Sequence, residues 1–366
     1  MPLHGTSWWI DAGAFNSPWS PSAIKFRVRE SSCRTAMASE RTNSAWVVTE
    51  GVAGMENQAL GLAERLGLAV EVKRVRLAAP WSWIAPRTLI SPFGHLTPDS
   101  SPLAPPWPEI VIGCGRQSIP IVKAIKEASG GRTLLVQTQH PRVAPSNFDL
   151  VIPPEHDGLA GANVFPIIGS PNRITQAKLA GARAAFAKLL MPVKTPRLAV
   201  LVGGTSKVYH FGDSEADELG AALGALSRDF GLIVLPSRRT GAANVARLAS
   251  ALQNTGAFLW NGEGENPYLG ALGWADSFLV TADSVNMACE AAATGKPVHI
   301  FPLPGGSDKF RKFHASLEAR GIARPFTGKI AQWSYEPLDE TGRAAKRVRG
   351  LLDLSANASD MKAKNT

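Results

Sequence analysis

Short apolar runs alternate with amphipathic stretches along most of the chain. The first apolar run, AWVVTE, is followed by a glycine turn and by MENQALGLAERLGL, in which apolar residues recur at helical spacing. The order of strand, glycine turn and helix returns in PEIVIGCGRQSIPIVKAIKEASGG. Regular alternation of strands and helices predicts a parallel sheet with right-handed crossovers. We predict strands of this sheet at 45–50, 69–77, within 108–131, at 133–142 and at 148–157.

The pattern restarts after FPIIGSPNRIT, a segment at 165–175 whose two prolines and glycine predict a hinge. The runs beyond it predict a second parallel α/β domain. The chain therefore divides into a Rossmann-like domain at 45–170, a second at 171–335, and a C-terminal helix with a basic tail at 336–366. Strands of the second domain are predicted at 197–204, 231–237, 257–262, 276–282 and 296–303.

Two segments depart from this pattern. Residues 1–44 show no sustained period, which predicts a disordered extension or a true start at Met37. A transit peptide is an alternative, because the extension holds several basic residues. Residues 80–108 are rich in proline and tryptophan, which excludes a central strand or a long helix. We expect a loop there, whose tryptophans pack on the core or contact a lipid-linked acceptor or a membrane surface.

Composition agrees with two domains in a reducing compartment. A chain of 366 residues with 45% hydrophobic content exceeds what one core usually serves. Its three cysteines, Cys33, Cys114 and Cys289, are widely spaced, which argues against a disulfide framework or a zinc site. No apolar run approaches the roughly 18 residues that a membrane span needs. We therefore expect a cytoplasmic protein.

The net charge of +9 suggests anionic partners. Basic residues cluster near the C-terminus, either as a solvated helix face or as a surface attracted to phosphates or anionic lipid. Peripheral association with the inner face of a membrane is therefore left open. No nucleic-acid partner is expected, because no recognition motif accompanies the charge. The sequence specifies no protein partner.

Three strand exits of the second domain carry residues suited to an anion. Glycines allow close backbone approach, hydroxyl and amide groups donate, and cationic side chains supply charge. A capped helix start after the third exit adds its dipole. Ordinary glycine turns, surface arginines and simple capping are the alternatives. The candidate diphosphate-binding residues are Gly203, Gly204, Thr205, Ser206, Lys207, Ser237, Arg238, Arg239, Thr240, Asp283 and Ser284.

Glu290 is the one carboxylate on an otherwise small-residue helix that starts after Ser284. A carboxylate two turns beyond a helix cap can face a ligand that lies across the helix terminus. Accepting two hydrogen bonds from the vicinal hydroxyls of a ribose is a task that suits it. An exposed helix glutamate is the alternative.

The stretch 266–303 resembles the nucleotide-binding half of GT-B glycosyltransferases, particularly the enzyme that adds N-acetylglucosamine to the peptidoglycan lipid carrier. This resemblance rests on Asp276, Ser284, Glu290 and the GKP turn. It implies a GT-B-like fold of two Rossmann-like domains facing a cleft. It also implies that Glu290 binds the ribose of a nucleotide diphosphate-sugar, taken as UDP-type, that VGGTS contacts its diphosphate, and that the segment ending at Asn261 reads the base. No separate cofactor or metal is required on this reading.

From residue 45 onward the chain is also similar to the GT-B-like mitochondrial-fission adaptor family, known in plants as elongated-mitochondria proteins and with many bacterial members. Membership implies the fold but leaves activity open, because the plant role is to recruit a dynamin-like fission protein. The matching stretches are TEGVAGMENQALGLAERLG, IGCGRQS, VQTQHPR, FDLVIPPEHD, LVGGTSKVYHFG and TADSVNMACEAAATGKPV.

The chain departs from the peptidoglycan enzyme at its first glycine turn, where Met55 replaces a histidine suited to deprotonating the acceptor. Glu50, Glu56 or His140 could supply the base that an inverting transfer needs. The alternatives are a solvated strand end, a first-turn helix charge and a turn residue, respectively. A second strand exit of the first domain is the predicted acceptor cleft, in contact with the acceptor or the donor, with a purely structural turn as the alternative: Gly113, Gly115, Arg116, Gln117 and Ser118.

The sequence thus favours transfer of a sugar from a nucleotide diphosphate to an acceptor. It does not identify the acceptor. A non-catalytic adaptor that keeps the fold is one alternative. A sugar-nucleotide epimerase is another, although the sequence does not place the cleft carboxylates and histidines that it would need.

Overall fold

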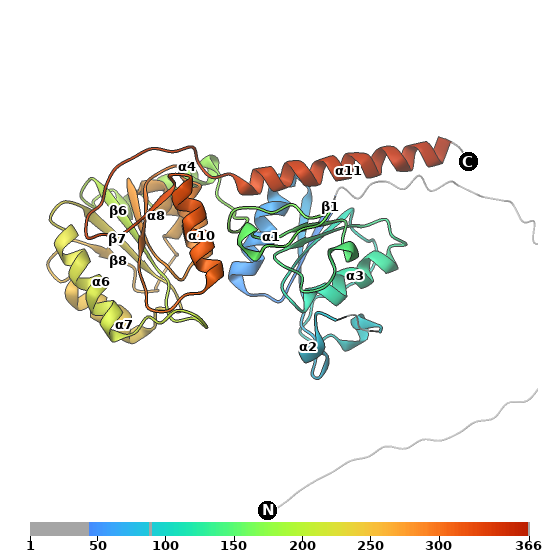
Figure 1. Cartoon of the computed structure of the whole chain (residues 1–366), viewed down its shortest axis with the longest axis horizontal. Helices are drawn as coiled ribbons and strands as arrows, with labels where there is room; N and C mark the ends of the chain where they lie inside the picture. The colour runs from blue at the N-terminus through green and yellow to red at the C-terminus, as the bar shows by residue number, and fades with distance from the viewer. Residues whose placement is uncertain (1–43, 88–89, 365–366) are drawn as a thin grey trace, which may run out of the picture. The chain divides into compact units, whose positions relative to one another are not determined.

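The computed structural model describes residues 44–87 and 90–364, all within one compact unit of the chain, Arg41–Thr366. The predicted extension, with Met37, lies outside the described residues except for its last residue, Ser44. Elements are labelled in Figure 1.

The first domain contains a five-stranded parallel sheet in the order β2-β1-β3-β4-β5. Val47 pairs with Val72 on one side and with Ile112 on the other, so β1 is an interior strand, and it is largely buried. Apolar runs without alternation produce such strands because both faces of a parallel sheet are covered. The strands are β1 (Ser44–Thr49), β2 (Ala69–Arg74), β3 (Ile110–Cys114), β4 (Leu134–Thr138) and β5 (Leu150–Ile152).

Helices cover both faces of this sheet. Leu62 of α1 (Ala53–Leu66) packs in the core of one face, and Ile125 of α3 (Ser118–Ala128) packs in the core of the other. The C-terminal helix α11 (Glu340–Lys364) lies on the α1 face, where Ala344, Ala345 and Val348 are buried. The chain therefore ends on the domain where its first strand lies, as the red helix above α1 shows in Figure 1.

The second domain contains a six-stranded sheet in the order β11-β10-β9-β6-β7-β8, again parallel throughout its described pairs. Five of its strands match predicted runs. The sixth, β11, was not predicted because it is three residues long, ends in proline and buries only Ala323. The strands are β6 (Arg197–Val202), β7 (Gly231–Pro236), β8 (Phe258–Leu259), β9 (Ser277–Thr281), β10 (Val298–Phe301) and β11 (Ala323–Pro325).

Helices surround this second sheet and close one continuous core. Two parallel sheets covered by helices confirm the predicted α/β class and its GT-B-like pair of Rossmann-like domains. The helices are α4 (Gln176–Ala185), α5 (Ala187–Leu190), α6 (Asp213–Leu226), α7 (Ala242–Ala251), α8 (Tyr268–Trp274), α9 (Val285–Ala292) and α10 (Asp308–Ala319).

The chain passes from one domain to the other between two neighbouring isoleucines. Ile167 packs in the core of the first sheet and Ile168 in the core of the second. This passage lies inside the segment 165–175 that was predicted as the hinge. A second passage precedes α11, because Leu338 packs against the second core and Ala344 against the first.

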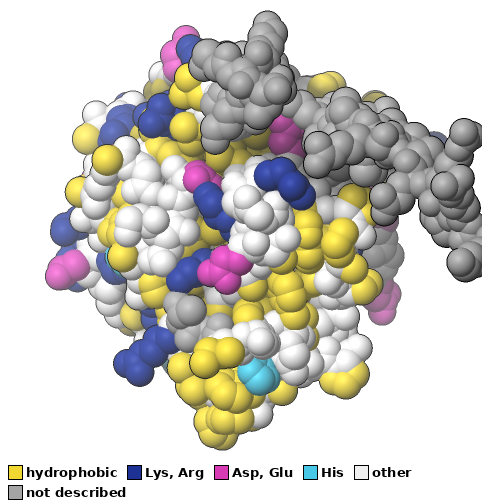
Figure 2. Space-filling model, turned by 90° about the vertical axis from the view of Figure 1, so that its right-hand side faces the viewer, with side chains coloured by type: hydrophobic (Ala, Val, Ile, Leu, Met, Phe, Trp, Pro, Cys, Tyr) yellow, Lys and Arg dark blue, Asp and Glu magenta, His cyan; other side chains and the backbone are white. Residues whose placement is uncertain are grey.

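The proline-rich segment forms only short elements, α2 (Trp81–Ile84) and η1 (Pro92–His95), as its prolines require. Trp107 packs edge-on against Trp46 at a centroid distance of 5.7 Å, so this tryptophan serves the core. Trp83 is 77% exposed. Figure 2 shows apolar side chains gathered on the lower lobe that carries α2. In the described part of the chain, no helix has the length and apolarity to cross a membrane.

Candidate functional site

The predicted site residues lie where the strand order of each sheet reverses. In the first sheet the chain steps outward from β1 in one direction to β2 and in the other to β3. In the second sheet, β6 and β9 have the same relationship. Ligands of open α/β sheets bind outside the carboxyl ends of strands at such a switch point. Glu50 and Gly115 follow β1 and β3, while Gly203 and Ala282 follow β6 and β9.

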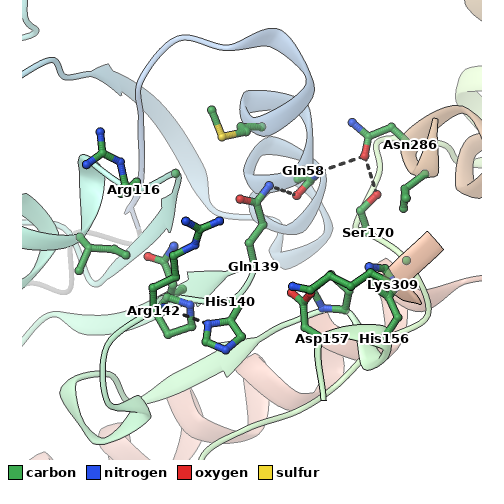
Figure 3. A pocket seen from close by; sticks show the side chains of 18 of the residues that line it. Gln58, Arg116, Gln139, His140, Arg142, His156, Asp157, Ser170, Asn286 and Lys309 are labelled. Carbon is green, nitrogen blue, oxygen red and sulfur yellow. Dashed lines mark hydrogen bonds and ion pairs between the residues drawn. The ribbon is translucent and has the colours of Figure 1, made fainter. Parts of the chain in front are cut away.

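A cavity of about 730 Å³ joins residues of both domains. Figure 3 shows Arg116, His140 and Arg142 on one side of it and Asn286 and Lys309 on the other. Its lining consists of Glu50, Met55, Gln58, Gly115, Arg116, Ile119, Gln137, Gln139, His140, Pro141, Arg142, Pro154, His156, Asp157, Gly169, Ser170, Lys207, Val285, Asn286 and Lys309.

A chain of side-chain hydrogen bonds crosses between the domains along the wall of this cavity. Gln139 Nε2 donates to Gln58 Oε1 at 2.9 Å, and Gln58 Nε2 donates to Asn286 Oδ1 at 3.0 Å. Ser170 Oγ donates to the same Asn286 oxygen at 2.8 Å (Figure 3). The amide of Asn286, at the start of α9, is thereby held from three sides, since its Nδ2 also lies 3.4 Å from Gly54 O.

The cavity lining carries more cationic than anionic side chains. Lys309 is neutralised by Asp157 at 2.6 Å. Arg116, Arg142 and Lys207 have no carboxylate partner within the described residues. A concave space lined by unpaired cations attracts an anionic ligand.

Glu50 is one of two predicted bases that line the cavity. Gln117 donates to both of its oxygens, from its backbone N–H at 2.8 Å and from Nε2 at 3.0 Å. A carboxylate has about four acceptor positions, so two bonds orient the group and leave acceptor capacity. Gly115 is needed beside it, because a Cβ there would lie 2.7 Å from Glu50 Oε1 and its φ is +105°.

The other two predicted bases differ from each other. His140 lines the cavity, and its Nδ1 accepts a 3.0 Å hydrogen bond from Arg142 N–H. A neutral imidazole then carries its proton on Nε2, which makes that nitrogen a donor suited to an anion. Glu56 lies outside the lining, where Arg74 binds it through two hydrogen bonds of 2.8 and 2.9 Å.

His156 also lines the cavity, and it was not singled out in the sequence. Burial lowers the pKa of its imidazole, while the neighbouring Asp157 raises it, and the net shift is downward. The ring meets Phe313 of α10 edge-on at 5.6 Å. Its position in EHD, the polar end of the predicted strand at 148–157, was the available signal. Glu50, His140, His156 and Asp157 are thus two carboxylates and two histidines on one cavity.

Only some residues of the predicted acceptor cleft line the cavity. Gly115 and Arg116 line it. Gly113 lies beneath a buried glutamine, because a Cβ there would be 2.5 Å from Gln137 Oε1. Gln117 binds Glu50 as described, and Ser118 Oγ donates to Gly115 O at 2.8 Å, which closes the turn.

The predicted diphosphate loops form a network around the buried carboxylate of Asp283. This carboxylate accepts from Gly204 N–H at 3.0 Å, from Thr281 Oγ1 at 2.7 Å and from Arg239, whose nitrogen lies 2.6 Å away. Gly203 permits this approach, since a Cβ on it would lie 2.2 Å from either Asp283 oxygen. Asp283 therefore joins three strand exits of the second domain.

The hydroxyl groups predicted to bind phosphate make bonds within these loops. Ser237 Oγ and Thr240 Oγ1 both donate to Gly203 O. Thr205 Oγ1 donates to Phe211 O, and Ser206 Oγ accepts from Tyr209 N–H. Lys207 is the member of the GGTSK turn that lines the cavity.

The helix α9 begins as predicted. Ser284 is its N-cap, and the Ser284 hydroxyl accepts from Met287 N–H at 3.3 Å. Val285 and Asn286, in the first turn, line the cavity. The positive end of the helix dipole therefore faces this space.

Three further predicted residues lie outside the cavity lining. Glu290 is half-buried on α9, and Tyr268 Oη donates to its Oε2 at 2.5 Å. Burial raises the pKa of the Glu290 carboxyl to about 7, although the bond from Tyr268 lowers it. Asn261 is exposed and exchanges hydrogen bonds with Glu263, and Arg238 is exposed. The described residues contain no group of three or more His, Cys, Asp or Glu arranged for a metal ion.

Residues 53–352 match the model of a protein family described as mitochondrial fission ELM1. The chain belongs to that family. Its sequence is 32% identical over 270 residues to the mitochondrial fission protein ELM1 of Arabidopsis thaliana, a match that spans 66% of this chain and 63% of that protein. It is 25% identical over 363 residues to an uncharacterized protein of Rickettsia prowazekii (strain Madrid E), covering 85% of this chain and 99% of the relative.

The ELM1-family membership inferred from the sequence is thereby confirmed, and this chain spans less than two thirds of the Arabidopsis protein. Among solved structures, MurG of Acinetobacter baumannii is similar with a TM-score of 0.46 and 13% identity, over 86% of this chain and 99% of MurG. The UDP-GlcNAc 2-epimerase of Methanocaldococcus jannaschii is similar with a TM-score of 0.48 and 10% identity, over 84% and 99% respectively.

Proposed function

We propose that the cavity binds a nucleotide diphosphate-sugar and that the protein transfers the sugar to a hydroxyl acceptor. The supporting observation is that one cavity joins the switch points of both sheets, with unpaired cations and a helix N-terminus on its lining. A diphosphate is the part of such a substrate that these groups recognise best.

The diphosphate would lie between Lys207 and the first turn of α9. This helix has eight residues, and its cap at Ser284 leaves the first-turn region open to the cavity. The nucleoside would extend along α9 toward Glu290. Tyr268 occupies one oxygen of that carboxylate, and the other has acceptor capacity for a ribose hydroxyl.

Glu50 is the base that the geometry supports for the transfer. In this step Glu50 takes the proton of the acceptor hydroxyl while the acceptor oxygen bonds to the anomeric carbon. The bond from that carbon to the diphosphate breaks, and the diphosphate leaves with the electron pair. Lys207 and the α9 dipole stabilise the charge that develops there.

The experiment measures release of UDP from UDP-N-acetylglucosamine with water as acceptor. We expect turnover by the wild type and a fall of about 100-fold or more in Glu50→Gln, with nucleotide affinity retained. Glu127→Gln, an exposed glutamate on α3, is the matched control and should keep full turnover. Equal rates in Glu50→Gln and the wild type would exclude Glu50 as the base.

Epimerisation of the sugar is a second candidate, favoured by the two carboxylates and two histidines that line the cavity. An epimerase removes and returns a proton on the sugar ring, so it incorporates deuterium from D₂O at that carbon. NMR of UDP-N-acetylglucosamine incubated with the protein in D₂O distinguishes the two reactions, because transfer leaves the ring protons in place.

A non-catalytic adaptor is the third candidate, favoured by Met55, which lines the cavity at the position of the missing histidine. The fission role in the name of the Arabidopsis relative agrees with such an adaptor. Nucleotide binding by the wild type with neither UDP release nor deuterium incorporation would support it over both enzymes.

A further inference from the structure

The first domain contributes two arginines to the cavity that the proposed transfer does not use. Arg116 follows β3 and Arg142 follows β4, so both stand at carboxyl ends of neighbouring strands. Neither guanidinium has a carboxylate partner within the described residues. Each guanidinium therefore offers its fork of donors to an oxyanion in the cavity.

Arg116 is fixed before any ligand binds. Its Nη1 donates to Ala85 O and lies 3.4 Å from Trp83 O, which anchors the guanidinium on the proline-rich segment. A guanidinium has five N–H donors in a rigid fork, so Arg116, which lines the cavity, keeps further donors for a ligand. Such a preorganised fork loses little freedom when it binds an oxyanion.

The loop that carries Arg142 is held in an uncommon conformation. Gln139 and Arg142 have φ angles of 70° and 60°, in the left-handed region that non-glycine residues avoid. The bond from Gln139 to Gln58 and the bond from Arg142 N–H to His140 Nδ1 maintain this loop. Such residues cluster at ligand clamps, where the surrounding structure compensates for the strain.

We propose that Arg116, Arg142 and the Nε2–H of His140 form a second anion-binding subsite, which takes a phosphate group. Donors from three side chains suit the three free oxygens of a phosphate. Lys207 belongs to the second domain, so this subsite shares none of its side chains with the one assigned to the nucleotide. That this subsite holds the phosphate of the acceptor rests on the proposed function. That it binds a phosphate at all does not.

The test is calorimetric titration of inorganic phosphate into Lys207→Gln protein, which lacks the cation assigned to the nucleotide. We expect phosphate to bind, and affinity to fall by about tenfold or more when Arg142→Gln is added. The side chain of Arg142 makes no described contact, so this variant should fold. Arg132→Gln, another exposed arginine of the same domain, is the control and should leave affinity unchanged.

Absence of phosphate binding by both Lys207→Gln and the wild type would overturn the proposal. Loss of binding on Lys207→Gln alone would do so as well, because it would indicate a single anion site. If phosphate binding depends on Arg142 but no nucleotide binds, the second subsite stands and the proposed function fails.

A second arm distinguishes a lipid headgroup from a free phosphate. Trp83 and Ile84, next to the anchor of Arg116, are 77% and 40% exposed. Geranyl phosphate and methyl phosphate carry the same head group, so tighter Arg142-dependent binding of geranyl phosphate would assign the site to a lipid phosphate. Equal affinities would assign it to a free phosphate. Binding of either that is independent of Arg142 would contradict the subsite.

Discussion

Tyr268 donates a 2.5 Å hydrogen bond to Glu290 and so joins the start of α8 to the body of α9. The pair is enclosed enough that burial raises the pKa of the Glu290 carboxyl to about 7. The carboxylate that the sequence assigns to the ribose therefore titrates near neutral pH. Both its charge and its orientation depend on a tyrosine that sequence reasoning did not single out.

Titration of Glu290 should make folding stability depend on pH. The folded carboxyl keeps its proton up to about pH 7, whereas the unfolded one loses it near 4.5. The folded state thus binds more protons between these values, and the free energy of unfolding should fall as pH rises through this window, by about 3 kcal/mol from this group. Urea unfolding of wild type and Glu290→Gln at a series of pH values measures the difference.

Tyr268→Phe should raise the pKa of Glu290 further, because it removes the hydrogen bond that favours the charged carboxylate. The fall in unfolding free energy should then continue to higher pH. Glu265→Gln, an exposed glutamate, should follow the wild-type pH profile. A Glu290→Gln profile parallel to that of the wild type from pH 4.5 to 7 would contradict the burial of this carboxyl.

Gly61→Ala should destabilise the protein. A Cβ at Gly61 in α1 would lie 2.3 Å from the backbone oxygen of Asn172 in the hinge segment. Such overpacking costs about 1–3 kcal/mol. Gly181→Ala in α4 meets nothing within 4 Å and should instead stabilise by about 0.5–1 kcal/mol, as helical Gly→Ala changes do. Opposite shifts of the urea midpoint test this, and a stabilised Gly61→Ala would argue against the close hinge contact.

Gln58 and Asn286 should be energetically coupled. Their 3.0 Å hydrogen bond crosses between the domains, and Gln58 is 7% exposed. A double-mutant cycle with both alanine variants should give a coupling energy of about 1 kcal/mol. The pair Gln58 and Asn254, on opposite domains and without a described bond, serves as the control and should be additive. Additivity of Gln58 with Asn286 would exclude the bridge.

Cys114 and Cys289 should resist alkylation in the native protein. Both are buried, and burial raises the pKa of each thiol to about 12. Since the thiolate is the reactive form, iodoacetamide at pH 8 should leave them unmodified until the chain unfolds. The measurement uses Cys33→Ser protein and mass spectrometry, with guanidinium-unfolded protein as the positive control. Rapid native modification of Cys289 would show that α9 opens.

The strands and the place where the chain passes between domains could be predicted because each is encoded locally. Unbroken apolar runs specify strands buried on both faces, and prolines with glycine mark the passage at Ile167 and Ile168. Strand β11 lacks such a run. It forms through backbone pairing with β10, which a local pattern does not encode. The packing of α11 on the first domain also depends on contacts far apart in the sequence.

The site could be predicted only in part, because side-chain pairing is set by the fold. Glycine turns and polar strand exits indicated the region, and Glu50, Arg116, His140 and Lys207 do line one cavity. The sequence could not show that Arg74 binds the carboxylate of Glu56 or that the carboxylate of Asp283 joins three loops. Nor could it place Gln58 beside Asn286, 228 residues away.

The most direct measurement is calorimetric titration of UDP and UDP-N-acetylglucosamine into wild type, Lys207→Gln and Lys188→Gln. Lys188 is an exposed lysine of the same domain outside the cavity and controls for charge. Binding that weakens by about tenfold or more in Lys207→Gln, a loss of about 1.4 kcal/mol, but not in Lys188→Gln, is the predicted result. No heat from folded wild-type protein with either ligand, or equal binding by all three proteins, would contradict the assignment of this cavity to a nucleotide diphosphate-sugar.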